Sequence, residues 1–399
     1  MKVAVLSLLL LCGVVGTAAA QDTSFDLYGF IMMDAGYDTK QVDPAWFDVL
    51  RTTKLPSFKD QFAPDGNMYF SVRQTRFGVK SSTPTDLGDF TTQFEWELFG
   101  VGADAGQTTI RLRHAYGQLG KFGAGQTWSP FMDIDVFPNT VEYWGPPGMA
   151  FFRNVQLRFM PLQGDTRFTI ALERPGASGD GGTYSARLDS LGGVQPHFPL
   201  PDLSAEYRMG KSWGYVELAG IVRRIEWEDP TPDVAPDLSG NVTGWGLNLS
   251  TNVKVGDNNT FRGSILYGEG VENYMNDAPA DVAIDKVNVS ATAPLDVIAL
   301  PVTGIVAFLD HNWNEKFSSS VGYSSIDIDN AEAQATSAFH RGQYAIGNLM
   351  YYPVPNVMTG VELQWGKREN FKDDPITGFN SSDDFRIQAS FKYNFSKTL

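Results

Sequence analysis

The sequence predicts an all-β fold, a transmembrane antiparallel β-barrel of about 16 strands. An apolar leader opens the chain, and no later apolar stretch is as long as a membrane-spanning helix. Apolar and polar residues alternate in one segment after another, which is the period of a strand with its two faces in different environments. The connections between these segments are short and long in turn, as in outer-membrane barrels.

The first residues have the features of a secretory signal. Lys2 supplies a positive charge, residues 3–15 form an almost unbroken apolar run, and residues 17–20 are small. We therefore expect residues 1–20 to be a signal peptide and residues 21–399 to form a single barrel domain. A membrane anchor is the alternative, but an apolar run of about 13 residues is too short to span a bilayer.

Composition excludes several kinds of site. The one cysteine among 399 residues, Cys12, lies inside the leader. The mature chain would therefore have no thiol for disulfides, zinc–thiolate sites or nucleophilic catalysis. We also expect no cofactor and no nucleic-acid partner, because neither a phosphate-binding glycine loop nor a basic nucleic-acid patch is evident.

Alternation is clear near the C-terminus, where Phe385, Ile387 and Phe391 are separated by polar residues. A soluble β-sandwich also alternates, so the number and length of the segments matter. Sixteen candidate strands follow one another, an even number as a closed single-chain barrel requires. They are residues 24–37, 67–81, 89–100, 107–119, 122–128, 153–162, 166–174, 201–210, 213–226, 241–254, 259–269, 300–311, 316–328, 339–352, 357–368 and 383–395.

The connections fall into two size classes. Short turns are expected at 86–88, 120–121, 163–165, 210–212, 256–259, 312–315 and 353–356. Longer loops rich in Gly, Pro, Asp and Asn are expected at 38–66, 129–152, 175–200, 227–240, 270–299 and 369–382. Sorting of this kind is typical of barrels with short periplasmic turns and long external loops, and it is not expected of a propeller or a sandwich.

A bilayer explains why such strands would close into a barrel. Every backbone N–H and C=O must be paired within the protein, and strands achieve this only when the sheet has no edge. Aromatic residues near strand ends would suit the two interfacial girdles. They are Tyr28, Tyr37, Tyr69, Trp128, Tyr207, Trp213, Trp245, Tyr267, Tyr351, Tyr352 and Trp365.

Several short stretches carry a family resemblance. They are SVRQTRFGVK at 71–80, RHAYGQL at 113–119, FGAGQTW at 122–128, PVPN at 353–356 and GKRE at 366–369. The chain resembles the trimeric general porins and, more closely, the DcaP-like porins. The resemblance implies a homotrimer, a diffusion channel and a third long loop folded into the barrel. Two departures are that residues 396–399 follow the last aromatic residue and that no helical stalk precedes the first strand.

Alternation also assigns side chains to the lumen. If Phe77 faces lipid, its neighbours face inward, and the same parity turns Leu112 and Tyr116 outward. The inward positions form a basic ladder of Arg76, Lys80, Arg111, Arg113, Arg158 and Arg167. Guanidinium groups offer planar, bidentate bonding to carboxylate or phosphate, so this ladder predicts a preference for small anions.

The arginines of this ladder have an alternative interpretation. They could form an ordinary solvated wall, in which they pair with the lumen acids Glu95, Glu97 and Glu173. Arg73 breaks the parity rule because it shares the parity of Phe77, which would fit a bulge or a subunit interface.

The loop at 129–152 contains the acids Asp133, Asp135 and Glu142. If this loop folds inward as in the resembling porins, it would set carboxylates against arginines across a constriction. The resulting transverse field would orient dipolar solutes and exclude apolar ones. An external loop with solvated acids is the alternative.

These expectations predict an outer-membrane porin for passive diffusion of small polar solutes, favouring anions such as carboxylates. Its partners would be outer-membrane lipids and lipopolysaccharide, which acids in the outer loops would contact through divalent cations. The net charge of -15 therefore says little about selectivity.

An outer-membrane barrel enzyme that hydrolyses lipid or peptide is the alternative function. None of the four histidines, His114, His197, His311 and His340, has metal-binding spacing or an evident nucleophile beside it. His114 has the parity of an outward residue that faces lipid or a subunit interface, whereas His340 lies near serines at an outer strand end. A plugged transporter is not expected, because no room for a plug precedes the first strand.

Overall fold

The computed structural model describes residues 23–190, 193–230, 237–286 and 295–399. The predicted signal peptide at 1–20 lies outside the described residues. Within the described part of the chain, no helix is both long enough and apolar enough to cross a bilayer.

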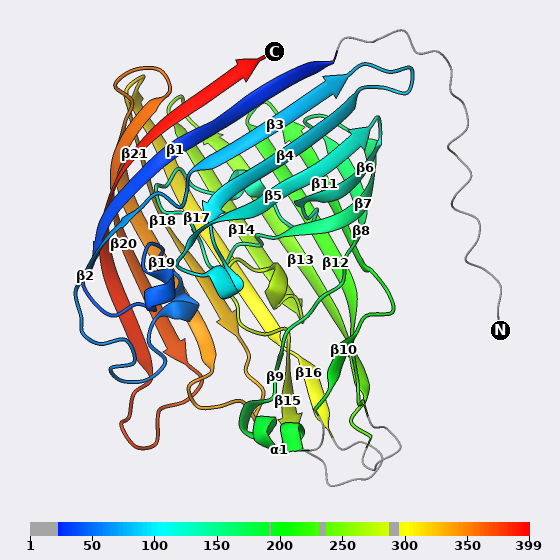
Figure 1. Ribbon diagram of the computed structural model, residues 1–399, viewed down its shortest axis with the longest axis vertical. Coiled ribbons are helices and arrows are strands. Elements are labelled where there is room, and N and C mark those ends of the chain that lie inside the picture. The colour runs from blue at the N-terminus through cyan, green and yellow to red at the C-terminus, as the bar shows by residue number, and fades with distance from the viewer. Residues whose placement is uncertain (1–22, 191–192, 231–236, 287–294) are drawn as a thin grey trace, which may run out of the picture.

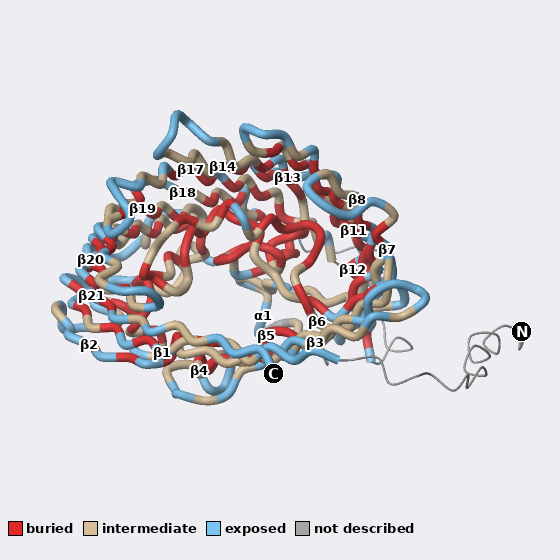
Figure 2. The backbone as a smooth tube through the Cα atoms, turned by 90° about the horizontal axis from the view of Figure 1, so that it is seen from above, coloured by how far each residue is buried: buried red, intermediate tan, exposed pale blue. Residues whose placement is uncertain are grey.

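One antiparallel sheet closes on itself (Figures 1 and 2). Its sixteen positions run, in order around the ring, β1, β3 to β8, β11 to β14, β17 to β21 and back to β1. The bounds are β1 Ser24–Asp38, β3 Arg76–Thr83, β4 Phe90–Phe99, β5 Thr108–Leu119, β6 Phe122–Trp128, β7 Arg153–Leu162, β8 Arg167–Glu173, β11 Asp202–Lys211, β12 Gly214–Glu228, β13 Gly240–Val255, β14 Asn259–Glu269, β17 Pro301–Asn314, β18 Phe317–Ile328, β19 Phe339–Tyr351, β20 Val357–Asn370 and β21 Ser381–Thr398.

Two short strands extend this ring. β2 (Asn67–Ser71) pairs with the second half of β1, whereas β3 pairs with its first half. β10 (Gln195–His197) pairs with the end of β12, beyond the part that pairs with β11. The prediction of about 16 antiparallel strands is confirmed. The predicted boundaries lie within three residues of those observed, except that the strand expected at 67–81 is divided into β2 and β3.

The two faces of the sheet differ as the alternation predicts. On β1, Ile31, Met33 and Tyr37 are exposed on the outer face, while Asp34 and Asp38 between and beyond them are buried. The same pattern of exposed large apolar side chains recurs on strands around the ring. An apolar outer band with buried polar side chains behind it is the arrangement of a barrel that sits in lipid.

The ends of the barrel also differ (Figure 1). Seven short turns of two to six residues connect strands at one end, where β1 begins and β21 ends. Residues 396–398, beyond the last aromatic, continue β21 and pair with residues 26–28. The long connections gather at the opposite end, together with the small sheet of β9 (Gly179–Asp180), β15 (Val282–Lys286) and β16 (Asp296–Ala299).

Helical structure in the described residues is confined to these connections. The elements are η1 Pro44–Trp46, η2 Thr52–Lys54, η3 Gly102–Asp104, η4 Ile134–Val136, η5 Gly182–Tyr184, α1 Ser185–Ser190 and η6 Glu272–Tyr274.

The main apolar core lies on the inner side of the sheet. It joins Leu50 and Leu55 of the first long connection, Phe131 of the segment 129–152 and Tyr274 of the connection after β14. Inward side chains such as Phe308 of β17 complete it. Figure 2 shows buried backbone inside the ring, in the position of this core.

Candidate functional site

A cluster of arginines surrounds two carboxylates on the inner face of β3, β4 and β5. Glu95 and Glu97, both from β4, are almost completely buried. Arg113 donates to both, with its Nε 2.6 Å from Glu95 Oε1 and its Nη1 2.7 Å from Glu97 Oε2. Arg76 donates to Glu97 over 3.2 Å, and Arg111 lies 3.8 Å from the same carboxylate. We call these five residues the arginine cluster.

Two groups outside the predicted ladder adjoin the arginine cluster. Arg153, the first residue of β7, lies 4.0 Å from Glu97 and over the ring of Trp128. The hydroxyl of Tyr143, from the segment 129–152, donates to Glu97 as well. Four guanidinium groups therefore face two carboxylates, which leaves a local excess of two positive charges.

A β-bulge in β5 sets the direction of these side chains. Glu95 pairs with His114 and Trp96 pairs with Leu112, so Arg113 is the extra residue. Arg113 and His114 are both buried, and His114 Nδ1 lies 3.0 Å from the Thr127 hydroxyl. The outward parity expected for His114 was wrong, because the bulge shifts the alternation by one residue.

The same shift corrects the orientation expected for Tyr116. Its ring lies under Arg158, 5.3 Å from the guanidinium carbon, and its hydroxyl donates to Gln118. The ring also occupies the space over Gly123, where a Cβ would meet the Tyr116 hydroxyl oxygen at 1.7 Å. Tyr116 therefore lies on the inner face, not the outer one.

Three further cations extend the arginine cluster along the wall. Arg158 bonds Gln156 Oε1 and the Trp128 carbonyl oxygen. Lys80 lies 5.0 Å from the ring of Tyr28, and Lys392 of β21 lies 4.2 Å from the ring of Phe30. The alternation Phe391, Lys392, Tyr393 contained the signal for Lys392, which the sequence reasoning did not use.

Arg167 belongs to a different group, on β8, β11 and β12. It pairs with Glu206 at 3.2 Å and with Glu217 at 2.9 Å. Arg208, which lies between the outward residues Tyr207 and Met209, also bonds Glu217. The parity of β11 would have identified Arg208, but the sequence reasoning missed it.

Two predicted loop acids join this second group. Arg208 donates to Asp133 at 2.6 Å and to Asp135 at 2.5 Å. Asp133 is buried and accepts from Tyr215 and Ser250 too, while the side chain of Asp135 is 47% exposed. We call Asp133, Asp135, Glu206 and Glu217 with Arg167 and Arg208 the acidic cluster. It has two more carboxylates than cations.

The third loop acid, Glu142, does not face the arginines. It is buried and accepts hydrogen bonds from the backbone N–H groups of Leu50 and Gly145. Burial raises the pKa of Glu142 to about 7, although these hydrogen bonds favour the carboxylate. Glu142 thus links the first long connection to the segment 129–152, and the expectation that it lines a constriction is not met.

Glu173 and Arg73 also lie outside the arginine cluster. Glu173 accepts from the hydroxyls of Ser129 and Ser204 at 2.7 and 2.5 Å. Arg73 lies in the interruption between β2 and β3, bonds Asp48 at 2.5 Å and stacks over Phe99. The interruption accounts for its broken parity.

Three aromatic residues expected in the girdles point inward instead. Tyr28 donates to Glu95, Tyr69 to Gln388, and Trp128 lies under Arg153. An aromatic residue near a strand end can face either lipid or the lumen, so its residue type does not reveal its orientation. The register of the strand decides which face it occupies.

The segment 129–152 contacts the inner side of many strands in turn. Asn248 of β13 donates to the Phe131 carbonyl oxygen, and Asn348 of β19 to that of Asn139. Further along, Thr140 donates to Glu362 of β20 at 2.7 Å. The close approach of Gly148 to β17 and β18 leaves no room for a side chain, since a Cβ would lie 2.1 Å from the Ser325 carbonyl oxygen.

A profile of the DcaP outer membrane protein family matches residues 14–395. The chain belongs to the DcaP outer membrane protein family. The earlier resemblance to DcaP-like porins is thereby confirmed. No curated protein is significantly similar in sequence.

Solved structures share the barrel of this DcaP family member. The crystal structure of the outer membrane channel DcaP of Acinetobacter baumannii has a TM-score of 0.75 at 22% identity, covering 94% of this chain and 97% of that one. An anion-selective porin from Comamonas acidovorans has a TM-score of 0.59 at 10% identity, over 94% and 100%. OmpF of Salmonella typhi has 0.55 at 11%, over 93% and 97%. At these identities the likeness demonstrates a common fold.

Proposed function

We propose that this protein forms a water-filled channel through which small polar solutes diffuse passively across the outer membrane, with a preference for anions such as carboxylates. The observation that carries the proposal is the cationic inner wall. Seven cations accompany two carboxylates there: Arg76, Lys80, Arg111, Arg113, Arg153, Arg158 and Lys392 with Glu95 and Glu97.

Part of this positive charge remains accessible. Arg113 and Arg153 are buried, whereas the side chains of Arg76 and Arg111 are 23% and 29% exposed. An anion that enters beside these two can accept hydrogen bonds from guanidinium N–H groups already held in place by Glu97. Such preorganisation removes most of the entropic cost of ordering the arginines around each solute.

We further propose that the segment 129–152 narrows the channel, as expected for the third long loop of the resembling porins. Its contacts with β13, β17 and β18 support this placement, because these strands lie across the ring from β4, while Tyr143 of the same segment reaches Glu97 in the arginine cluster. A segment that crosses the lumen in this way would leave a passing solute less room beside the arginine cluster. The acidic cluster adds a region of negative charge to the inner wall. The electric field between the two clusters would orient dipolar solutes.

A homotrimer in the outer membrane completes the proposal. The OmpT barrel of Vibrio cholerae, with a TM-score of 0.54 and 12% identity, is described as a trimer form. Lipids and lipopolysaccharide would contact the exposed apolar band, which includes Ile31, Leu218 and Val321.

Planar-bilayer recording under a salt gradient tests the channel and its ion preference together. Arg111→Glu and Arg158→Glu should each shift the reversal potential toward cations. Arg341→Glu is the matched control, because Arg341 lies in an exposed pair with Asp327 outside the arginine cluster. Selectivity should fade near 1 M salt, where the Debye length is about 3 Å.

Two results would count against the proposal. Unchanged ion preference in both variants would mean that the inner wall does not govern permeation. An absence of channel steps combined with hydrolysis of lipid or peptide would favour the enzyme class instead.

A further inference from the structure

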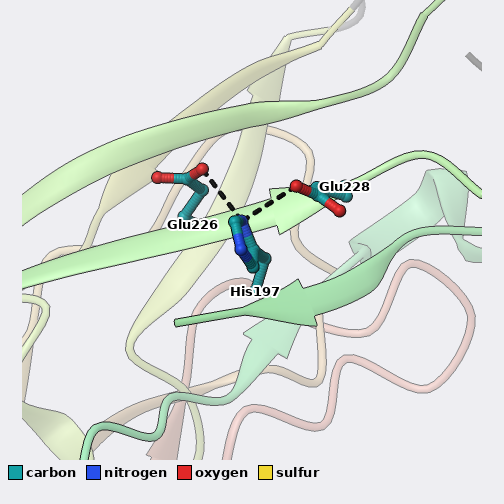
Figure 3. A group of neighbouring side chains, drawn as sticks. All are labelled: His197, Glu226 and Glu228. Carbon is teal, nitrogen blue, oxygen red and sulfur yellow. Dashed lines mark hydrogen bonds and ion pairs between the residues drawn. The ribbon is translucent and has the colours of Figure 1, made fainter. Parts of the chain in front are cut away.

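Three side chains with metal-binding chemistry converge at the long-loop end of the barrel (Figure 3). β10 pairs antiparallel with the end of β12, and His197 lies directly opposite Glu226. Glu228 is two residues further along β12, so it shares the face of Glu226. One imidazole and two carboxylates therefore project from the same face of a two-stranded ribbon. Sequence spacing did not reveal this group, because the histidine comes from a separate strand.

Both carboxylates approach the same ring nitrogen. His197 Nδ1 lies 3.0 Å from Glu226 Oε1 and 2.9 Å from Glu228 Oε1. A ring nitrogen carries at most one hydrogen, so it cannot donate to both carboxylates fully. Two negative groups held this close also repel each other unless a positive charge lies between them. A shared cation would satisfy all three groups at once.

We propose that His197, Glu226 and Glu228 form a binding site for a divalent transition-metal cation, with Zn²⁺ the best match. The three ligand atoms lie within 4.8 Å of one another. Zinc–nitrogen and zinc–oxygen bonds of about 2.0–2.2 Å place the ligand atoms of a tetrahedral ion about 3.4 Å apart. The Glu228 side chain is 60% exposed and can close the difference by rotation about its own bonds.

The donor set decides between classes of cation. Imidazole favours Zn²⁺, Cu²⁺ and Ni²⁺, whereas Ca²⁺ and Mg²⁺ prefer sites built from oxygen alone. Arg224 Nε donates to the other oxygen of Glu226, Oε2, at 2.5 Å. That hydrogen bond orients the carboxylate and leaves Oε1 turned toward His197. Three protein ligands would leave one position of a tetrahedral zinc ion for water or a fourth partner.

Such a cation would act as a clamp. β10 belongs to the long connection between β8 and β11, and three paired residues hold it to β12. A zinc ion bound by His197 and by both glutamates would add bonds between these two strands. The site lies on an extension at the loop end, away from the arginine cluster, so it is independent of the channel proposal.

Isothermal titration calorimetry of the detergent-purified full chain with ZnCl₂ tests the site. We expect one zinc equivalent per chain, and at least about tenfold weaker binding in His197→Asn and in Glu228→Gln. His311→Asn is the matched control, because His311 bonds Asn259 near the short-turn end. X-ray absorption at the zinc edge of the loaded protein should detect one nitrogen and two or more oxygen neighbours.

The opposite outcomes overturn the proposal. If His197→Asn binds zinc as the wild type does, the ion lies elsewhere. If the wild type binds no zinc at concentrations up to about 1 mM, the group is a hydrogen-bonded cluster of one histidine and two carboxylates. If Mg²⁺ competes at equal concentration, the site does not have the proposed selectivity.

Discussion

Arg113 is a buried arginine that pairs with two carboxylates. Its side chain is 5% exposed and lies between Glu95 and Glu97. Removing one partner of a buried ion pair lowers stability far more than replacing both partners by apolar residues. The reason is that the remaining charge stays buried without compensation.

We therefore expect Arg113→Leu to destabilise the barrel by about 3–5 kcal/mol. The measurement is the unfolding free energy from reversible urea denaturation in detergent or lipid. Arg341→Leu serves as the control, since that side chain is 44% exposed and such pairs contribute at most about 1 kcal/mol. Equal losses in the two variants would contradict the importance of the arginine cluster for stability.

Glu142 provides a prediction about pH. Its pKa rises from 4.5 to about 7 on folding, so the folded state favours the protonated carboxyl. The stabilisation is complete below about pH 4.5 and is lost as the pH rises through 7. At about 1.4 kcal/mol per pKa unit, the loss is about 3 kcal/mol.

The Glu142→Gln variant isolates this effect. Gln cannot ionise, so its stability relative to the wild type should improve between about pH 4.5 and pH 7 and level off above pH 7, whatever its absolute stability. Urea denaturation at several pH values gives the difference, in which all other titrating groups cancel. A difference independent of pH would show that Glu142 does not change its charge in this range.

At the scale of elements, the attachment of the segment 129–152 to the wall can be tested at one residue. Gly148→Val places a side chain where the Cβ alone would lie 2.1 Å from the Ser325 carbonyl oxygen. The segment must then move away from β17 and β18, and we expect higher and noisier single-channel conductance. Gly347→Val is the control, because a Cβ there meets nothing within 4 Å. Identical conductance in both variants would mean that the segment does not limit flow.

The strands could be predicted because membrane and lumen impose opposite demands on alternate residues. That pressure acts along the whole length of β13 or β20, so their boundaries were close to those observed. It is absent from the separate small sheet of β9, β15 and β16 and from β10, which extends the ring beyond the membrane-facing strands, and none of these was predicted. The break at Arg73 was visible only as a parity error, because the buried partner of Arg73, Asp48, is distant in the sequence.

The site was less predictable than the fold. The structure has Arg76 and Arg111 beside Glu97, but alternation failed beyond Arg113, where one extra residue reverses the parity of β5. The partners of the loop acids depend on where the backbone of 129–152 travels. Nothing local in the sequence specifies that Asp133 meets Arg208, 75 residues away.

The whole molecule should resist unfolding as one unit. β1 and β21 pair over 13 residues, and every ring position has a partner on both sides. We expect a β-type circular-dichroism spectrum and a trimer by light scattering. We also expect the mobility of the protein in a gel to change when the sample is boiled. A predominantly helical spectrum would rule out the barrel. A single chain by light scattering would rule out the trimer alone.

The seam between β1 and β21 has a consequence for biogenesis. It joins Asp26 to Thr398, 372 positions apart, so the ring cannot be sealed until the last residues have been synthesised and delivered. Until then the chain carries two strand edges and a broad apolar band through an aqueous compartment, where both promote aggregation. Joining such remote strands is also slow, because so much chain entropy must be lost before the contact forms. The polypeptide should therefore need a chaperone that holds it unfolded in transit, and the first strand to emerge must wait longest for its final neighbour.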